Sequence, residues 1–135
     1  MITVVANGCF AAVTAGHVHL LSEARKLGDR LIVLFNTVES IRRLKPDGRP
    51  IIPDGLRVRL LCSLPFVDAA VPFPGDTPEP ELERLRPDIL VKGAEYEGLW
   101  VPGQQYAGSV AFVKMLPGIS TTWLLRDANT GRTQK

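Results

Sequence analysis

A turn of small residues between an apolar run and a helical segment is the first part of this sequence that could do chemistry. It follows the apolar residues 2–6, starts at Gly8 and ends in Thr14-Ala15-Gly16-His17. Helical periodicity follows, so the turn leads into a helix N-terminus, whose first N–H groups lack internal partners and carry the positive end of the helix dipole. A phosphate placed there meets donors that already point at it. A histidine at the same place indicates chemistry at that phosphate.

The turn matches neither of two common nucleotide-binding motifs. Gly8 and Gly16 do not form a G-x-G-x-x-G fingerprint, and the Gly-Lys-Ser/Thr of a P-loop is missing. Taken alone, a histidine after a glycine at a helix start is more often a surface residue than a site residue. The rest of the chain has to decide between the two interpretations.

Composition and charge limit the classes of function. The chain has 135 residues, 45% of them apolar and 22% charged, which suits one soluble globular domain with one core. The formal net charge of +2 comes without a clustered basic stripe, so nucleic acid and anionic membranes are not expected partners. Basic residues gather in Arg42-Arg43-Leu44-Lys45 and around Arg49 and Arg57. That local bias favours a small phosphorylated ligand.

The two cysteines and the apolar runs predict the compartment. Cys9 and Cys62 have neither metal-ligand spacing nor the pattern of a disulfide framework, which favours small buried side chains in a reducing cytoplasm. No apolar run approaches the roughly 20 residues that a membrane span needs. The first apolar run also lacks a preceding charged region. We therefore expect a cytoplasmic protein without a membrane partner and without a protein metal site.

Apolar blocks of strand length alternate with helical segments along the chain. The expected strands are 2–6, 30–35, 67–73, 88–92 and 110–116. The expected helices are 18–27, 37–44 with Thr37 or Ser40 as cap, 53–64, one that starts at Pro78 with Thr77 as cap, and a last one through Leu125 capped by Ser120 or Thr121. Residues 93–108 are expected to form a loop with one helical turn near 104–106. This alternation predicts an α/β fold, a doubly wound parallel five-stranded sheet whose ligands bind beyond the carboxyl ends of the strands.

The turn that ends at His17 also resembles a sequence signature of a known protein family. Thr14-Ala15-Gly16-His17 resembles the T/H-x-G-H signature of the nucleotidyltransferase superfamily with the cytidylyltransferase-like fold. Four further stretches resemble the adenylyltransferase domain of bacterial heptose-phosphate enzymes: 22–33, 42–51 with Arg57, 86–93 with Tyr96, and 118–122. The resemblance implies a Rossmann-like, HIGH-type fold in a single domain over residues 1–127, with a polar tail at 128–135. It also implies a homodimer.

The resemblance implies a reaction as well. In this family a substrate phosphate attacks the α-phosphorus of a nucleoside triphosphate and pyrophosphate leaves. The enzyme forms no covalent intermediate, so its work is positioning and the stabilisation of charge. For this chain the resemblance implies ATP as co-substrate, Mg2+ on its phosphates, and a small phosphorylated sugar or polyol as acceptor.

Individual roles also follow from the resemblance alone. His17, Thr14 and Lys45 are implied to be catalytic, with His17 donating to the triphosphate and Thr14 supplying a hydroxyl donor. The implied nucleotide-binding residues are Gly8, Cys9, Phe10, Gly16, His17, Lys92, Ser120 and Thr121. Lys45 and Arg57, together with Asn36, are implied to bind the substrate, the two cations neutralising phosphate charge from across the cleft.

Two alternatives stay open at this point. One is a cytidylyltransferase that uses CTP and glycerol 3-phosphate or a similar alcohol phosphate. The other is a nucleotide-binding protein with little catalysis, because Ala11 stands where the family usually has aspartate and residues 93–108 differ from the family's helix there. Tyr96 and Trp100 could stack on a base or close the core, and for Trp123 the core is favoured.

Overall fold

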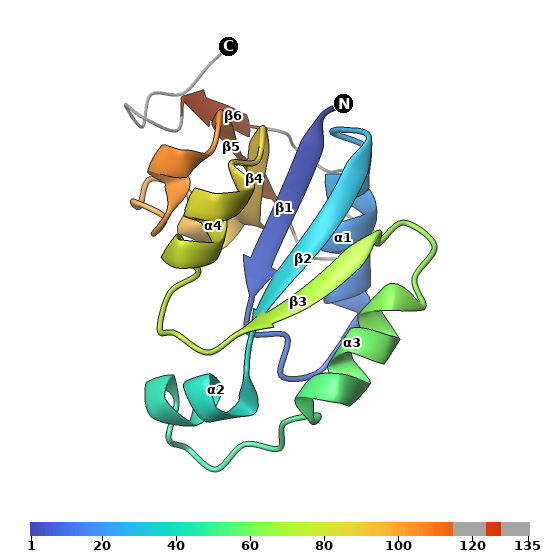
Figure 1. Ribbon diagram of the computed structural model, residues 1–135, viewed down its shortest axis with the longest axis vertical. Coiled ribbons are helices and arrows are strands. Elements are labelled where there is room, and N and C mark those ends of the chain that lie inside the picture. The colour runs from blue at the N-terminus through green and yellow to red at the C-terminus, as the bar shows by residue number, and fades with distance from the viewer. Residues whose placement is uncertain (115–123, 128–135) are drawn as a thin grey trace.

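The structure is a computed structural model that describes residues 1–114 and 124–127. Within them the chain forms one mixed sheet with the strand order β3-β2-β1-β4-β5-β6 (Figure 1). The strands are β1 (Thr3–Gly8), β2 (Arg30–Asn36), β3 (Ala69–Phe73), β4 (Ile89–Gly93), β5 (Ser109–Val113) and β6 (Leu124–Asp127). The first five run parallel, as predicted, and β6 pairs antiparallel with β5.

Helices cover both faces of this sheet, which makes the fold doubly wound. The α-helices are α1 (Ala15–Arg25), α2 (Val38–Leu44), α3 (Asp54–Cys62) and α4 (Glu79–Leu85). Two short 3-10 helices follow β4, η1 (Ala94–Tyr96) and η2 (Gln104–Tyr106), the second of them at the predicted helical turn. Helices α1 and α3 lie on one face, and α4 lies on the other (Figure 1).

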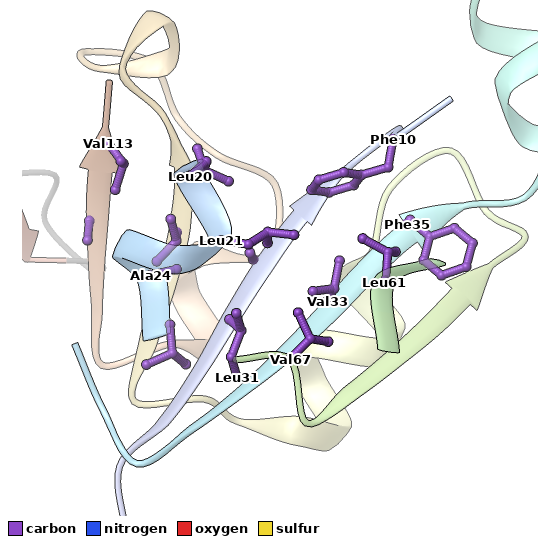
Figure 2. Close-up of a cluster of buried hydrophobic side chains, with 14 residues drawn as sticks. Phe10, Leu20, Leu21, Ala24, Leu31, Val33, Phe35, Leu61, Val67 and Val113 are labelled. Atoms are coloured by element: carbon purple, nitrogen blue, oxygen red, sulfur yellow. The ribbon is translucent and has the colours of Figure 1, made fainter. Parts of the chain in front are cut away.

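Each face of the sheet has its own core. On the α1 face, Leu20, Leu21 and Ala24 form an apolar stripe that packs on the strands (Figure 2). On the opposite face, Leu82 of α4 packs in a separate cluster with Phe73 and other buried side chains. Because β1 and β2 are buried on both sides, their sequences are continuous apolar runs rather than alternating ones.

The strand order places a ligand-binding edge at the end of β1. Its neighbours are β2 on one side and β4 on the other, because the chain runs from β1 through β2 to β3 and then crosses back to β4. The turn after β1, the end of β2 and the segment after β4 therefore open at the same carboxyl edge of the sheet. In doubly wound folds, ligands bind at such a switch in strand order.

Two details of the predicted elements are wrong. Residues Leu124–Asp127 form strand β6, not the end of a helix, because a short apolar run fits either structure and here an open sheet edge was available to pair with it. Helix α4 begins at Glu79, one residue later than predicted, with Pro78 and not Thr77 as its N-cap residue; the Thr77 hydroxyl donates to the Glu79 carboxylate at 3.0 Å and accepts from the Glu79 N–H only at 3.5 Å.

Other predictions concern the remaining caps and the ends of the chain. Thr37 does cap α2, since its hydroxyl accepts from the Ser40 N–H at 3.1 Å. Ser120, Thr121, Trp123 and the tail 128–135 lie outside the described residues. No helix within the described part is long and apolar enough to cross a membrane.

Candidate active site

The turn after β1 is held in an unusual backbone conformation. Phe10 has a φ of 48°, a region that residues with a side chain rarely adopt, and its ring is buried. A Cβ on Gly8 would lie 3.1 Å from that ring, so glycine is what lets the turn close over Phe10. The ring also packs on the His17 imidazole, with 4.9 Å between the centroids. The buried phenylalanine thus fixes the backbone of the turn and one side of His17.

Thr14 and His17 form a reciprocal cap at the start of α1. The His17 N–H donates to the Thr14 hydroxyl at 3.3 Å, and the Thr14 N–H donates to Nδ1 of His17 at 3.1 Å. A nitrogen that accepts a hydrogen bond carries no proton, so in the neutral ring the proton lies on Nε2. Burial lowers the pKa of His17, and the nearby Ala12 carbonyl raises it in part. His17 is therefore a neutral side chain at pH 7 that presents an Nε2–H donor.

A first cleft opens between this turn, the end of β4 and the segment after α2. Its lining consists of Asn7, Gly8, Cys9, Phe10, Ala11, Ala12, His17, Leu20, Lys45, Arg49, Lys92, Gly93, Glu95 and Tyr96. The cations Lys45, Arg49 and Lys92 face a single carboxylate, that of Glu95, within this lining. Such an excess of positive charge in a concave site favours a polyanion.

Lys92 is the most constrained cation of the first cleft. Its Nζ donates to Oδ1 of Asn7 at 2.8 Å and lies 4.2 Å from the centroid of the Tyr96 ring. Burial lowers the pKa of Lys92 to about 8, while the charge of Glu95 raises it and that of Lys45 lowers it further. The ammonium group can donate three hydrogen bonds. It is therefore held in place while its charge is only partly compensated.

The opposite wall of the first cleft is the loop after α2. Lys45 ends that helix and is exposed, and Arg49 pairs with Asp47 at 2.5 Å. The loop is tied to the turn after β1 by a hydrogen bond from the Ile52 N–H to the Ala11 carbonyl at 3.0 Å. Its cations Lys45 and Arg49 line the same cleft as Lys92.

Arg57 lies below the turn and is absent from the lining of the clefts. Its side chain is fully buried. The guanidinium donates to the carbonyls of Cys9 at 3.0 Å, Asn36 at 2.7 Å and Ile52 at 2.7 Å, and it pairs with Asp54 at 2.7 Å. The structure therefore does not bring Arg57 to the position across the cleft that was expected of it. It joins three loops instead.

A second cleft adjoins the first. It is lined by Asn7, Gly8, Cys9, Asn36, Leu44, Lys45, Phe73, Asp76, Thr77, Pro78, Lys92, Tyr96 and Pro102. Asn7, Gly8, Cys9, Lys45, Lys92 and Tyr96 belong to both linings, and we call them the shared wall. Two phosphorylated molecules, one in each cleft, would have their phosphates beside the same two lysines.

The structure brings together part of the predicted set. Gly8, Cys9, Phe10, His17, Lys45 and Lys92 line the first cleft, and Asn36 lines the second. Thr14 and Gly16 belong to the start of α1 and line neither cleft, and Ser120 and Thr121 fall outside the described residues. Sequence reasoning missed Asn7, Arg49, Glu95 and Asp76 as lining residues. Asn7 directly precedes Gly8 at a strand end and Arg49 lies in the basic segment, so both could have been found.

Metal-binding side chains are scarce. Within residues 1–114, no group of three or more histidine, cysteine, aspartate or glutamate side chains is placed to hold a metal ion. The Glu95 carboxylate is the one acidic group of the first cleft. This chain therefore has no metal cage of its own in that region.

Comparison with known proteins shows which family this sequence matches. The sequence profile of the cytidylyltransferase-like family matches residues 5–127. The bifunctional protein HldE of Alcanivorax borkumensis is 48% identical over 120 residues, which is 86% of this chain and 25% of that protein. The HldE protein of Streptomyces coelicolor is 46% identical and covers 95% of this chain, which corresponds to 28% of its own length. The chain thus spans about a quarter of the length of these relatives.

A solved structure is also similar. The lipopolysaccharide core biosynthesis protein of Thermoplasma volcanium superposes with a TM-score of 0.61 at 33% identity. The match covers 70% of this chain and 76% of that one.

Proposed function

The chain belongs to the cytidylyltransferase-like family of nucleotidyltransferases, and from this premise we propose that it transfers AMP from ATP to a phosphorylated sugar or polyol, with release of pyrophosphate. The observation that carries the proposal is the shared wall between the two clefts. It gives a triphosphate and an acceptor phosphate one common set of cations, Lys45 and Lys92. Two phosphates that must react have to be brought together against their mutual repulsion, and these lysines offset it.

In the proposed reaction the triphosphate occupies the first cleft. The acceptor phosphate oxygen attacks the α-phosphorus, and the bond from that phosphorus to the bridging oxygen of pyrophosphate breaks. His17 donates its Nε2 proton as a hydrogen bond to a phosphate oxygen, where negative charge accumulates in the transition state. Because its Nδ1 is held by Thr14, this donor is aimed before the substrate arrives. Lys45, Lys92 and Arg49 compensate charge on the phosphates.

Mg2+ is proposed to enter with the triphosphate. Magnesium commonly binds through substrate phosphates and one or two carboxylates while it keeps several waters. The residues present fit that mode, since Glu95 lines the first cleft and no cluster of metal-binding side chains competes within residues 1–114. Bound there, the metal would neutralise phosphate charge.

The alternative of a binding protein with little catalysis has one specific observation in its favour. Ala11 lines the first cleft at the position where the family usually carries aspartate. If that carboxylate is needed for turnover, the natural chain binds nucleotide but turns over slowly, and Ala11→Asp raises the rate. CTP as the donor remains the second alternative within the family.

One assay separates these proposals. The protein is incubated with Mg2+, ATP or CTP, and a panel of sugar and alcohol phosphates, and pyrophosphate release is measured. Release with ATP and sugar 1-phosphates is the expected result. Release only with CTP and glycerol 3-phosphate would replace our assignment by the cytidylyltransferase alternative. If nucleotide binds but no acceptor gives pyrophosphate release, and Ala11→Asp restores that release, our assignment would be replaced by that of a nucleotide-binding protein.

A further inference from the structure

The second cleft has opposite chemistry at its two ends. At the shared wall it presents the ammonium groups of Lys45 and Lys92. At the far end, where β2 ends and the turn after β3 begins, its polar lining comes from Asn36, Asp76 and Thr77. The end with the two lysines thus suits an anion, whereas the far end is lined by uncharged polar groups and one carboxylate.

The hydrogen bonds around Ser40 fix how the Asn36 amide is turned. The Ser40 hydroxyl lies 2.7 Å from the Gly75 carbonyl oxygen, which can only accept, so the single hydroxyl proton is used there. The same hydroxyl lies 3.0 Å from the Asn36 amide and must accept from it. The NH2 group of Asn36 therefore faces Ser40, and Oδ1 faces the other way. Asn36 is only 5% exposed, and its Oδ1 meets no hydrogen-bond donor among the described residues.

Asp76 supplies a second acceptor that the protein holds in place. Its Oδ1 accepts from Nε and Nη2 of Arg43 at 3.3 and 3.2 Å, while no donor in the described part of the chain reaches Oδ2. Arg43 also donates to the Pro74 carbonyl at 2.6 Å, so the turn after β3 is fastened to α2. The Thr77 hydroxyl is already used on Glu79. The far end therefore offers two acceptor oxygens, and among these side chains the second N–H of the Asn36 amide is the donor that remains.

We propose that the far end of the second cleft is a hydroxyl-reading subsite, in which Oδ1 of Asn36 and Oδ2 of Asp76 accept hydrogen bonds from the acceptor substrate. A ligand hydroxyl can donate to the buried Oδ1 of Asn36 without bringing charge. The Asp76 side chain is 66% exposed, so a hydroxyl at its Oδ2 takes the place of water. The ligand that fits has a phosphate at the lysines and hydroxyls at the other end, which describes a polyhydroxylated phosphate. The subsite rests on the proposed function, because it assumes that the acceptor occupies the second cleft.

The subsite explains selection more than rate. A buried acceptor without a donor is costly, so a ligand lacking the hydroxyl is rejected more strongly than the loss of one contact in water would suggest. A ligand of the same size without hydroxyls would leave the Asn36 oxygen buried and unsatisfied. We therefore expect discrimination on the order of tenfold to a hundredfold between such ligands.

The test compares ligands of one size on the natural protein. Mannose 1-phosphate and a heptose 1-phosphate are titrated against cyclohexyl phosphate, a ring of similar size without hydroxyls, in the presence of Mg2+ and a non-hydrolysable ATP analogue. The expected result is that the sugar phosphates bind at least tenfold more tightly. Equal binding of cyclohexyl phosphate, or binding of none of the three, would overturn the subsite.

A variant localises the preference. Asn36→Leu keeps the size of the side chain and removes the acceptor, so the preference for sugar phosphates should fall at least fivefold while the Kd of the ATP analogue changes by less than twofold. Arg59→Met on α3, exposed and outside both linings, is the control. A preference that survives Asn36→Leu in a folded protein contradicts the assignment.

The outcomes also separate this inference from the proposed function. Pyrophosphate release without a preference for hydroxylated acceptors would leave the nucleotidyl transfer intact and remove the subsite. A preference in binding without pyrophosphate release from any acceptor would leave the subsite intact and remove the proposed reaction.

Discussion

Two cations stand near the carboxyl edge of this sheet, the buried Arg57 and the half-buried Lys92, and their surroundings differ. Arg57 donates to three backbone carbonyls, pairs with Asp54 and lies over the Phe35 ring at 4.7 Å. Lys92 has one short hydrogen bond, to Asn7, and a ring contact with Tyr96. Arg57 is shut off from the clefts, whereas Lys92 lines both of them.

The difference indicates which of the two cations has a structural role and which one binds a ligand. The protein itself compensates the guanidinium of Arg57, which joins the turn after β1, the end of β2 and the loop before α3. Burial lowers the pKa of both cations, that of Lys92 to about 8, but the Asp54 carboxylate and three carbonyls accept from Arg57, whereas the ammonium group of Lys92 has one short hydrogen bond, to Asn7. An arriving phosphate can supply what is missing. We therefore treat Arg57 as a residue that shapes the site and Lys92 as one that binds its ligand.

The largest expected effect is the loss of Arg57. Arg57→Met removes the buried charge, leaves three carbonyls without its N–H donors and leaves the Asp54 carboxylate with the Val38 N–H alone, so the free energy of unfolding should fall by about 3–5 kcal/mol. Urea denaturation followed by circular dichroism measures it. Arg59→Met on the same helix, where the side chain is exposed, should change stability by less than about 0.5 kcal/mol. A stable Arg57→Met protein that has lost only substrate affinity would reverse our comparison.

His17 tests the cleft side of the comparison. His17→Ala removes a donor aimed at the reacting phosphate, so kcat should fall on the order of a hundredfold to a thousandfold. Steady-state kinetics with saturating ATP and sugar phosphate separate kcat from KM. A drop in stability large enough to explain the lost activity would show that the histidine matters mainly as part of the cap.

Lys92 should give the stability a dependence on alkaline pH. Its pKa is about 8 in the folded chain against an ordinary value of 10.5, so between these pH values the unfolded chain binds more protons than the folded one. The contribution of this group to the free energy of unfolding therefore rises as the pH increases from 8 to 10.5. Urea titrations across this range should show the rise in the natural protein and not in Lys92→Met. Identical slopes in the two proteins would mean that Lys92 is not desolvated as described.

Thr14 carries the smallest expected effect. Thr14→Ser keeps the hydroxyl, whereas Thr14→Ala removes the cap of α1 and should lower the free energy of unfolding by about 1 kcal/mol. The hydroxyl also contacts Nδ1 of His17 at 3.1 Å, so kcat should fall as well, by less than in His17→Ala. Equal kcat values for the two threonine variants would show that the hydroxyl does not orient the imidazole.

The sheet was largely predictable because its strands are buried on both faces. Such strands appear as continuous apolar runs, and residues such as Thr37 mark a helix start by a local hydrogen bond that sequence alone suggests. Strand β6 escaped prediction because its short apolar run has no periodicity that separates a strand from a helix. Only the free edge of β5 decided it.

The site divides in the same way. The turn from Gly8 to His17 is contiguous, so its residues could be assembled on one side of a cleft before any fold was known. The buried position of Arg57 could not be predicted from the sequence, because it depends on three separate segments that fold around one guanidinium. The second cleft also joins segments far apart in the chain, with Asn36 at the end of β2 and Asp76 after β3. Its polarity follows from hydrogen bonds at Ser40 that no sequence pattern reveals.

One measurement tests the central contrast most directly, and it is made on Lys92→Met. The dissociation constant of ATP with Mg2+ and the free energy of urea unfolding are measured on the same preparation at pH 7. The contrast predicts that the dissociation constant rises at least tenfold while the free energy of unfolding does not fall by more than about 1 kcal/mol, because a charge whose pKa is lowered by burial opposes folding at pH 7 and its removal costs little stability. An unchanged affinity for ATP together with a strongly destabilised protein would contradict it and place Lys92 in the same class as Arg57.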